Sequence, residues 1–173
     1  MLNRLLVAAS FILVGSGVLR AQNYFPLAVG NRWEYIDEAR NRRVVVEVTG
    51  VDEIDNRKWF KVRWLDGAEH RLRLDGQGTL LELDHGGGPD VVWVKFAAPR
   101  VWKYESKFGR ARVKTRDANR IEIVYDPVCC DRGVLSEVYA DAVGLKERIH
   151  MTYGGRRKYT LVSARIAGRE LSL

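Results

Sequence analysis

The sequence predicts an all-β protein whose single antiparallel meander of about ten to twelve strands forms a barrel or half-barrel. Apolar and polar residues alternate with period two in most segments, as where Val62 and Trp64 alternate with Lys61 and Arg63. Turn signals such as Asp75-Gly76 separate the alternating segments. No stretch after residue 21 sustains a helical apolar stripe over three turns, so helices are not expected.

Short connections decide how the predicted strands are arranged. Parallel crossovers need about a dozen residues or more, so neighbouring strands must run antiparallel. A sheet of this many strands curls, and closing it removes exposed edges; a two-sheet sandwich is the alternative. No linker divides residues 22–173, which are expected to form one domain. The predicted strands are residues 32–38, 42–51, 57–65, 69–75, 78–84, 90–96, 100–105, 108–116, 119–126, 134–140, 143–153 and 156–168.

The first 21 residues are predicted to be a secretory signal peptide. Arg4 supplies a positive n-region, an apolar segment begins at Leu5, and Ala21 offers a small residue for cleavage. The apolar segment is short for a membrane span, although an uncleaved N-terminal anchor is the alternative. We therefore expect an exported protein, periplasmic or extracellular, with no transmembrane span after cleavage.

The first predicted strand, residues 32–38, follows a segment with strong turn signals. Pro26 stiffens the chain, and Gly30-Asn31 provides a turn before the strand. Trp33 and Tyr35 are two residues apart, so they lie on one face of the strand. Large aromatic side chains on that face are expected to cap one end of the barrel.

This opening segment, residues 24–35, reads YFPLAVGNRWEY and resembles that of uncharacterised secreted bacterial β-rich proteins, which begin with FPLxxGNxWxY after the signal peptide. The closing segments 143–145, 154–155 and 159–164 also resemble that group. The resemblance implies export and a β fold. It implies no reaction, because the function of those proteins is unknown.

The hairpin between the strands at 108–116 and 119–126 has a specific predicted register. A three-residue loop, residues 117–119, places Val113 opposite Ile123 and Lys114 opposite Glu122. Such a loop is expected to hold Asn119 in the left-handed region, which asparagine tolerates.

Basic residues are in excess, with a formal net charge of +7, and several recur at alternate positions. The clearest series lies on one face of a predicted strand, and the favoured interpretation is a solvated face balanced by Glu47, Glu82 and Glu122 on neighbouring strands. The alternative is an anion-binding face. Export makes nucleic acid an improbable partner. The series consists of Arg110, Arg112, Lys114 and Arg116.

The sequence contains none of the common catalytic motifs that we searched for. The sequence contains no GxSxG, HExxH or GxxxxGK[ST] motif and no GxGxxG that opens a helix. His70, His85 and His150 lack the close pairing typical of metal sites, and they are interpreted as surface or loop residues. We therefore expect a protein that is not an enzyme and that uses no cofactor and no metal.

Cys129-Cys130 is the least ordinary dipeptide. Adjacent Cα atoms lie about 3.8 Å apart, closer than the separation of about 4.4 Å that a disulfide ordinarily needs. The candidates are a strained vicinal disulfide that locks a loop, two unbridged thiols, and intermolecular or redox-active use.

Five tryptophans and five phenylalanines favour a non-enzymatic binding module with a lipid or other hydrophobic small molecule in an aromatic-lined lumen. Within that reading, a solid core filled by the same aromatic residues is favoured over an open lumen. One alternative is a secreted hydrolase-type enzyme with a carboxylate or histidine site assembled by the fold. Another is a structural subunit of a cell-envelope assembly, which would bind an envelope protein through an exposed apolar patch. The candidate lining residues are Trp33, Tyr35, Phe60, Trp64, Trp93 and Trp102.

Overall fold

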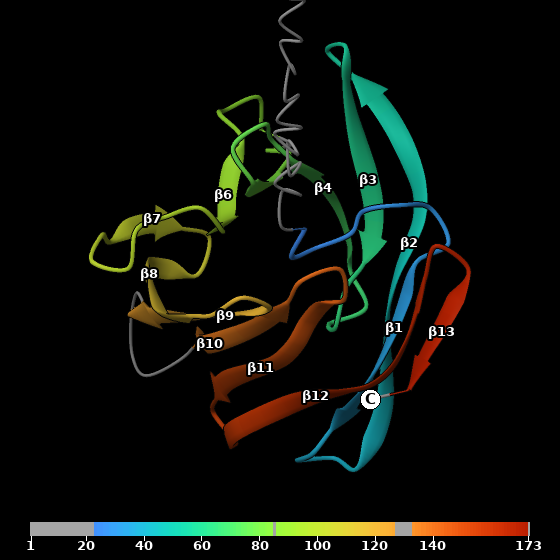
Figure 1. The fold of residues 1–173 in the computed structure, drawn as a ribbon, viewed down its shortest axis with the longest axis vertical. Coiled ribbons are helices and arrows are strands. Elements are labelled where there is room, and N and C mark those ends of the chain that lie inside the picture. Colours follow the sequence, from blue (N-terminus) through green and yellow to red (C-terminus); the bar gives the residue numbers. More distant parts are fainter. Residues whose placement is uncertain (1–22, 85, 127–132, 173) are drawn as a thin grey trace, which may run out of the picture.

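The computed structural model describes residues 23–84, 86–126 and 133–172. All regular secondary structure within these residues is β-strand. The predicted all-β class is confirmed (Figure 1). The predicted signal peptide, His85, Cys129 and Cys130 lie outside the described residues. The strands are β1 Arg32–Asp37, β2 Arg42–Ile54, β3 Arg57–Arg63, β4 Glu69–Leu74, β5 Thr79–Glu82, β6 Val91–Lys95, β7 Tyr104–Ser106, β8 Gly109–Arg116, β9 Arg120–Asp126, β10 Gly133–Ala140, β11 Gly144–Thr152, β12 Gly155–Ile166 and β13 Arg169–Ser172.

The strands form one antiparallel sheet that is nearly closed into a barrel. Their order is β6-β5-β4-β3-β2-β1-β12-β11-β10-β9-β8-β7, and β13 pairs with the C-terminal part of β12. The predicted meander is therefore confirmed, and a single sheet takes the place of the alternative two-sheet sandwich.

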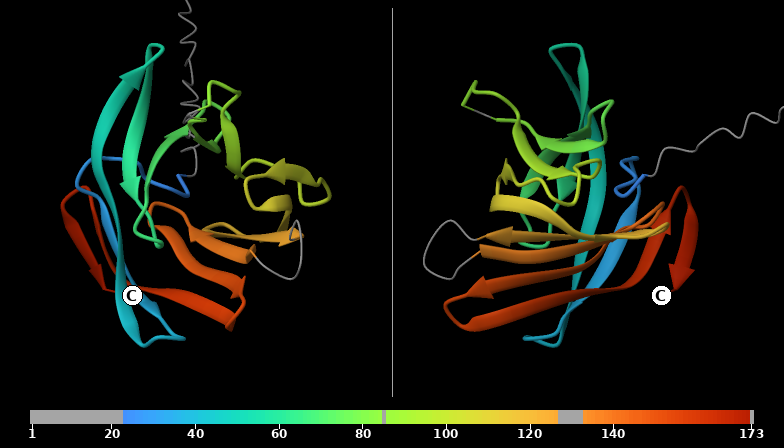
Figure 2. Two further views of the ribbon diagram at one scale, coloured as in Figure 1. Left: turned by 180° about the vertical axis from the view of Figure 1, so that it is seen from behind. Right: turned by 60° about the vertical axis from the view of Figure 1, so that its left-hand side comes forward.

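The two edges of the sheet, β6 and β7, are consecutive in the chain but share no ladder. They meet at the left of Figure 1, and Figure 2 shows the same junction from two other directions. One main-chain hydrogen bond crosses it, from the Lys107 amide to the Val92 carbonyl at 2.7 Å. We call this junction, between β6 and residues 104–109, the seam.

Alternation along the strands sends one row of side chains into the barrel and the other row outward. Trp33 and Tyr35 on β1 and Val62 on β3 are completely buried in one continuous apolar cluster. Trp59 has the opposite orientation on β3. It is also buried, but outside that cluster and beneath the Arg73 guanidinium, whose carbon lies 5.0 Å from the ring centroid.

The segment before β1 folds back onto the interior. Phe25 is completely buried and stacks on Trp33 with ring centroids 5.2 Å apart. The buried Asn31 amide donates to the Pro26 carbonyl at 2.8 Å, and its oxygen accepts from the Ala167 amide at 2.9 Å. Asn31 therefore ties the opening segment to the end of β12. These hydrogen bonds explain why the buried residue at position 31 is polar. The sequence alone predicts only that Gly30-Asn31 forms a turn.

The β8–β9 hairpin confirms one part of the predicted register and corrects another. Val113 lies opposite Ile123, as predicted. The prediction for Asn119 is wrong, because it is not among the described residues with positive φ. The Asp117 amide donates to the Arg120 carbonyl at 2.9 Å, which closes a loop of only two residues. The Asp117 carboxylate accepts from the Asn119 and Arg120 amides, so side-chain capping replaces a left-handed residue.

A β-bulge at Lys114 compensates for the shorter loop. The predicted position of Lys114 opposite Glu122 is wrong, because Thr115 lies opposite Glu122 in the ladder. The Lys114 side chain still forms an ion pair with Glu122, at 3.0 Å, and Arg116 now lies opposite the buried Ile121. Beyond the bulge, therefore, Arg116 faces the interior side, where it donates to the carbonyls of Phe96 and Ala98. The candidate anion-binding face loses Arg116 for this reason.

The observed bounds differ from those of every predicted strand by one residue or more, and three strands show the cause or the size of the difference. The strand predicted at 156–168 ends at Ile166, because Ala167 and Gly168 both take positive φ, 49° and 77°, and turn the chain into β13. The strand predicted at 100–105 begins only at Tyr104, after a turn in which the Trp102 amide donates to the Pro99 carbonyl. β2 extends to Ile54 rather than residue 51.

Replacing Gly144 by alanine tests the packing of β1 against β11. Gly144 has φ +112°, and a Cβ there would lie 2.9 Å from Trp33 Nε1. Gly155 has a similar φ of +100° but nothing within 4 Å of an added Cβ, so Gly155→Ala is a matched control for backbone strain. We expect Gly144→Ala to lower the free energy of unfolding by about 2 kcal/mol more than the control. Urea unfolding measures the difference, and equal losses would contradict the packing described.

Candidate functional site

A row of aromatic side chains crosses the barrel interior and ends at the seam. Ring centroids of Phe25 and Trp64 lie 5.7 Å apart, and those of Trp64 and Trp93 lie 5.0 Å apart. Trp93 on β6 then contacts Phe108 at 5.1 Å across the seam, and Phe108 contacts Tyr125 on β9 at 5.5 Å. Side chains therefore close the seam where main-chain pairing is missing.

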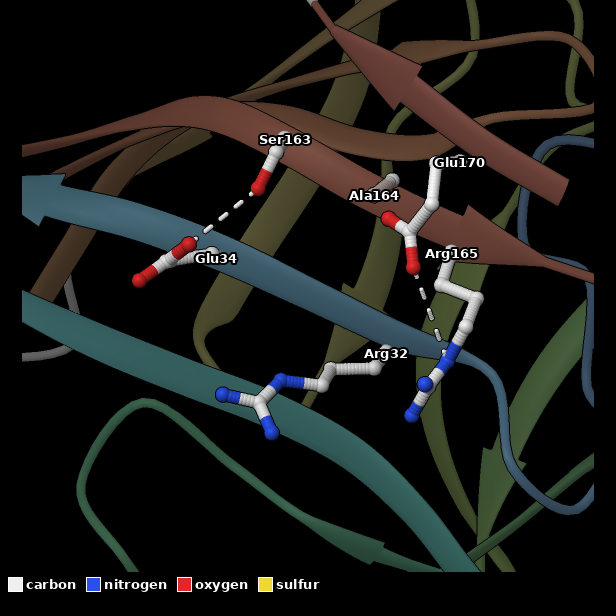
Figure 3. A pocket seen from close by; sticks show the side chains of 6 residues that line it. All are labelled: Arg32, Glu34, Ser163, Ala164, Arg165 and Glu170. Atoms are coloured by element: carbon white, nitrogen blue, oxygen red, sulfur yellow. Dashed lines mark hydrogen bonds and ion pairs between the residues drawn. The ribbon is translucent and has the colours of Figure 1, made fainter. Parts of the chain in front are cut away.

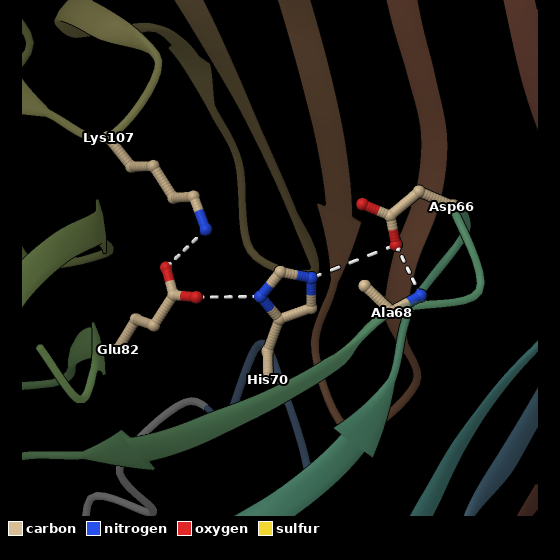
Figure 4. A network of polar contacts seen from close by, with 5 residues as sticks. All are labelled: Asp66, Ala68, His70, Glu82 and Lys107. Carbon is tan, nitrogen blue, oxygen red and sulfur yellow. Dashed lines mark hydrogen bonds and ion pairs between the residues drawn. The ribbon is translucent and has the colours of Figure 1, made fainter. Parts of the chain in front are cut away.

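Charged side chains lie beside these rings. Figure 4 shows His70 of β4 between Glu82 of β5 and Asp66, with Lys107 on the far side of Glu82. His70 Nδ1 is 2.6 Å from Glu82 Oε1, and Lys107 Nζ is 2.5 Å from Glu82 Oε2. His70 Nε2 lies 3.7 Å from Asp66 Oδ1, which is too long for a hydrogen bond. Lys107 thus joins the two sides of the seam through Glu82.

The Glu82 carboxylate determines the tautomer of His70. Burial raises the pKa of Glu82, but hydrogen bonds from His70 and Lys107 outweigh burial and leave that pKa below its ordinary value. An ionised carboxylate only accepts hydrogen bonds, so Nδ1 of His70 carries the hydrogen. In the neutral imidazole, Nε2 is therefore left as an acceptor without a hydrogen-bond partner among the described residues.

A second charged pair lies deeper in the barrel. Glu137 on β10 is completely buried, and its Oε2 accepts from the hydroxyls of Tyr125 at 2.6 Å and Tyr139 at 2.8 Å. Burial, reinforced by the Glu137 charge, raises the pKa of both tyrosines well above the ordinary range. Both phenols therefore remain neutral donors at physiological pH.

Arg148 on β11 is the cation nearest to Glu137. Its side chain is 9% exposed, and its Nε lies 3.6 Å from Glu137 Oε1. Its guanidinium carbon lies 4.7 Å from the Phe108 ring centroid and 5.8 Å from the Trp64 ring centroid. No side chain or carbonyl of the described residues accepts a hydrogen bond from it. Arg148 is therefore a buried hydrogen-bond donor whose described contacts are two cation–π contacts and one long ion pair.

Buried polar atoms without a hydrogen-bond partner concentrate at this place. The described residues contain eight such side-chain atoms, and four of them lie here: Trp64 Nε1, Trp93 Nε1, His70 Nε2 and Glu137 Oε1. The Trp93 ring contacts the Trp64 and His70 rings, and Arg148 links Glu137 to Trp64. Each unsatisfied buried group costs about 1–3 kcal/mol. We call these four residues with Lys107, Phe108, Glu82 and Arg148 the seam cluster, and it is our candidate functional site.

The predicted lining residues divide into three groups. Trp64 and Trp93 belong to the seam cluster. Trp33 and Tyr35 are buried in the same interior, but their polar atoms already donate to the Val143 and Leu145 carbonyls, and Phe60 is half-buried against the core. The placement predicted for Trp102 is wrong, because it is 66% exposed in the loop before β7.

Sequence reasoning missed the charged members of the seam cluster. His70 was predicted to be a surface or loop residue, but it lies on the face of β4 that carries the buried Leu72. Glu82, predicted on a solvated face, lies opposite Leu72 and shares its interior face. Period-two alternation already implied both placements. No comparable signal marks Arg148, because bulges between β10 and β11 interrupt the alternation there.

The candidate anion-binding face is largely neutralised. Arg110 pairs with Glu105 at 3.2 Å and Lys114 pairs with Glu122 at 3.0 Å. Glu122 thus balances this face as the solvated interpretation predicted. Arg112 is exposed and has no ion pair within the described residues.

Two other arrangements are weaker candidates. A surface pocket of about 240 Å³ lies over β1, β12 and β13, but Figure 3 shows its Glu34 hydrogen-bonded by Ser163 and its Glu170 paired with Arg165. No group of three or more His, Cys, Asp or Glu side chains in the described residues is arranged to hold a metal ion.

Comparisons with known proteins add no family. No family model, curated protein or solved structure matches this chain. The resemblance of the opening segment to secreted bacterial proteins therefore stays a prediction. Within the part of the chain that the structure describes, we find no helix with the length and apolarity of a membrane span.

Acid titration tests the Glu82 contacts. A carboxylate whose folded pKa is depressed stabilises the protein above its unfolded pKa of about 4.5, and that stability is lost as pH falls through the folded pKa. We expect Glu82→Gln to lower the free energy of unfolding by about 1 kcal/mol or more at pH 6. This loss should shrink steadily below pH 4.5.

The matched control is Glu105→Gln, since Glu105 is a 77% exposed partner of Arg110. Exposed pairs contribute little, so this variant should differ little from the wild type at any pH. Urea unfolding at a series of pH values measures both variants. A pH-independent loss for Glu82→Gln would count against the ionised His70–Glu82–Lys107 arrangement.

Proposed function

We propose that this chain is an exported, non-enzymatic binding protein whose barrel takes an amphipathic ligand at the seam cluster. The apolar body of the ligand lies among the interior aromatic rings, and its anionic head group, such as a carboxylate, meets Arg148, Trp64 and Trp93. One observation carries the proposal: buried, unpartnered hydrogen-bond donors lie together in an aromatic interior beside the one unpaired junction of the described sheet.

The chemistry of the donors favours an anion. Indole Nε1 and guanidinium groups only donate hydrogen bonds. The neighbouring carboxylate, Glu137, accepts from two tyrosines through Oε2, while its Oε1 has no hydrogen-bond partner among the described residues and lies 3.6 Å from Arg148 Nε. A carboxylate on the ligand would accept from the indoles and the guanidinium, and so would relieve the cost of burying them unsatisfied.

The surroundings favour an apolar body attached to that head group. Trp64 is 3% exposed and Trp93 is 1% exposed, and both continue into the row that ends at Phe25. Ligand sites in proteins are mostly lined by such side chains, with a few polar groups that fix orientation. A lipid with one chain and a carboxylate head matches both requirements.

Access for the ligand is through the seam. Ladders of main-chain hydrogen bonds join every other pair of neighbouring strands in the described sheet. The seam is held by one main-chain hydrogen bond, the Lys107–Glu82 ion pair and contacts such as that of Trp93 with Phe108. Separating β6 from β7 therefore breaks fewer main-chain hydrogen bonds than opening a ladder, although it also breaks the hydrogen bond from the Lys95 amide to the Tyr104 hydroxyl at 3.2 Å. The same separation parts the rings that the ligand would displace.

Binding of the fluorescent fatty acid cis-parinaric acid tests this proposal. Trp64→Phe and Trp93→Phe keep an aromatic ring but remove the N–H donor. We expect each to weaken binding roughly tenfold, the effect of losing one hydrogen bond to a charged group. The methyl ester of the probe, which lacks the charge, should bind more weakly than the acid to the wild type.

Trp59→Phe is the matched control. Trp59 is as buried as Trp93 but lies outside the interior cluster, so this change should leave probe binding unaltered. Equal affinity for the acid and the ester, or equal losses in all three variants, would overturn the proposed site.

Hydrolysis is a second candidate function, favoured by the His70–Glu82 pair. A histidine oriented by a carboxylate through Nδ1, with a free Nε2, is equipped to act as a general base. Hydrolysis of a p-nitrophenyl ester should then fall to the uncatalysed rate in His70→Gln. Identical rates for the two proteins would remove this candidate.

A further inference from the structure

The loop between β6 and β7, residues 96–103, exposes two adjacent apolar side chains. Val101 is 84% exposed and Trp102 is 66% exposed. The other exposed large apolar residues of the described chain are not adjacent in sequence: Val29, Val51 and Tyr153. Adjacent exposed apolar residues on a loop are a typical feature of an interaction surface.

The same region carries most of the basic excess of the chain. Residues 95–116 contain one acidic residue, Glu105, in a chain whose whole net charge is +7. The eight basic residues of this segment are Lys95, Arg100, Lys103, Lys107, Arg110, Arg112, Lys114 and Arg116. Carboxylates on β5, β7 and β9 pair with Lys103, Lys107, Arg110 and Lys114.

Positive charge remains near the loop after that pairing. Lys95, Arg100 and Arg112 have no carboxylate partner within the described residues. Arg112 is exposed on β8, and Arg100 is exposed on the loop itself. The loop and the outer face of β8 therefore present cations beside Val101 and Trp102.

Side-chain hydrogen bonds hold the loop against β8. Arg116 donates to the carbonyls of Phe96 and Ala98, and Arg100 donates to the Lys114 carbonyl at 3.1 Å. A pocket of about 330 Å³ lies beside Trp102, with the apolar side chains of Ala97 and Pro99 and the amines of Lys95 and Lys103 in its wall. Both apolar and cationic groups are thus presented by a fixed loop.

We propose that loop 96–103 docks onto an anionic lipid surface. Val101 and Trp102 insert among the lipid head groups, while the neighbouring lysines and arginines contact phosphates. Tryptophan prefers the membrane–water interface, and basic residues near an anionic leaflet are attracted to its negative surface potential. Two apolar side chains form too small a core for a stable protein–protein interface, which buries about 800 Å² per partner.

The inference does not rest on the proposed ligand, but the two are connected in space. Loop 96–103 begins where β6 ends and leads directly into β7. Docking through this loop would therefore place the seam beside the lipid surface.

Sedimentation with lipid vesicles tests the proposal. The chain is compared on vesicles of phosphatidylcholine alone and on vesicles that also contain phosphatidylglycerol. We expect binding to the anionic vesicles that weakens as salt is added. The double variant Val101→Ser, Trp102→Ser should bind them at least tenfold more weakly. The control is Tyr153→Ser, because Tyr153 is 82% exposed on the distant β11–β12 turn, and it should bind like the wild type.

Every variant keeps the same N-terminal segment, so differences between variants report the loop alone. Equal binding by the double variant and the wild type, or equal losses in the double variant and Tyr153→Ser, would overturn the proposal. Trp64→Phe should leave vesicle binding unchanged, whereas the double variant should still bind cis-parinaric acid in solution. Failure of one proposal is thereby distinguished from failure of the other.

Discussion

The antiparallel ladder between β1 and β12 joins residues from opposite ends of the chain, with Trp33 opposite Ala164 and Tyr35 opposite Leu161. This ladder places the two ends of the meander in the middle of the sheet. The edges of the sheet must then be β6 and β7, although they are neighbours in sequence. A barrel made this way is held by long-range pairing on one side and by side chains on the other.

Because the seam lacks a ladder of main-chain hydrogen bonds, the side chains that close the barrel there also form the candidate functional site. Lys107, from the β7–β8 turn, reaches Glu82 on β5, and Glu82 in turn orients His70. Phe108 contacts Trp93 across the seam and also lies beneath the Arg148 guanidinium. Polar groups that would be costly in a sealed core are therefore concentrated where the barrel is most easily opened.

The sequence predicted the architecture well because period-two alternation is a local property. Most strands lie within a few residues of the predicted bounds, and Val113 faces Ile123 as expected. Errors arose where a single backbone event changed the orientation of later residues. The bulge at Lys114 turned Arg116 inward, and a turn before Tyr104 left Trp102 on the surface.

The candidate site was harder to predict than the fold, since its members come from strands that only the closed sheet brings together. Alternation placed His70 on the same face as Leu72, but it did not identify Glu82 as its partner. Arg148 and Phe108 are 40 positions apart in the printed sequence, and no local pattern connects them. Contacts of this kind depend on the closure of the barrel and not on the local β-strand propensity of the residues.

Amide hydrogen exchange of the Lys107 N–H tests the central claim that the seam is the weak point of the barrel. This amide makes the main-chain hydrogen bond that crosses the seam, to the Val92 carbonyl. The account predicts that it exchanges by local opening, orders of magnitude faster than the amides of the β1–β12 ladder, which should exchange only on global unfolding. Protection of Lys107 equal to that of the β1–β12 ladder would contradict the account.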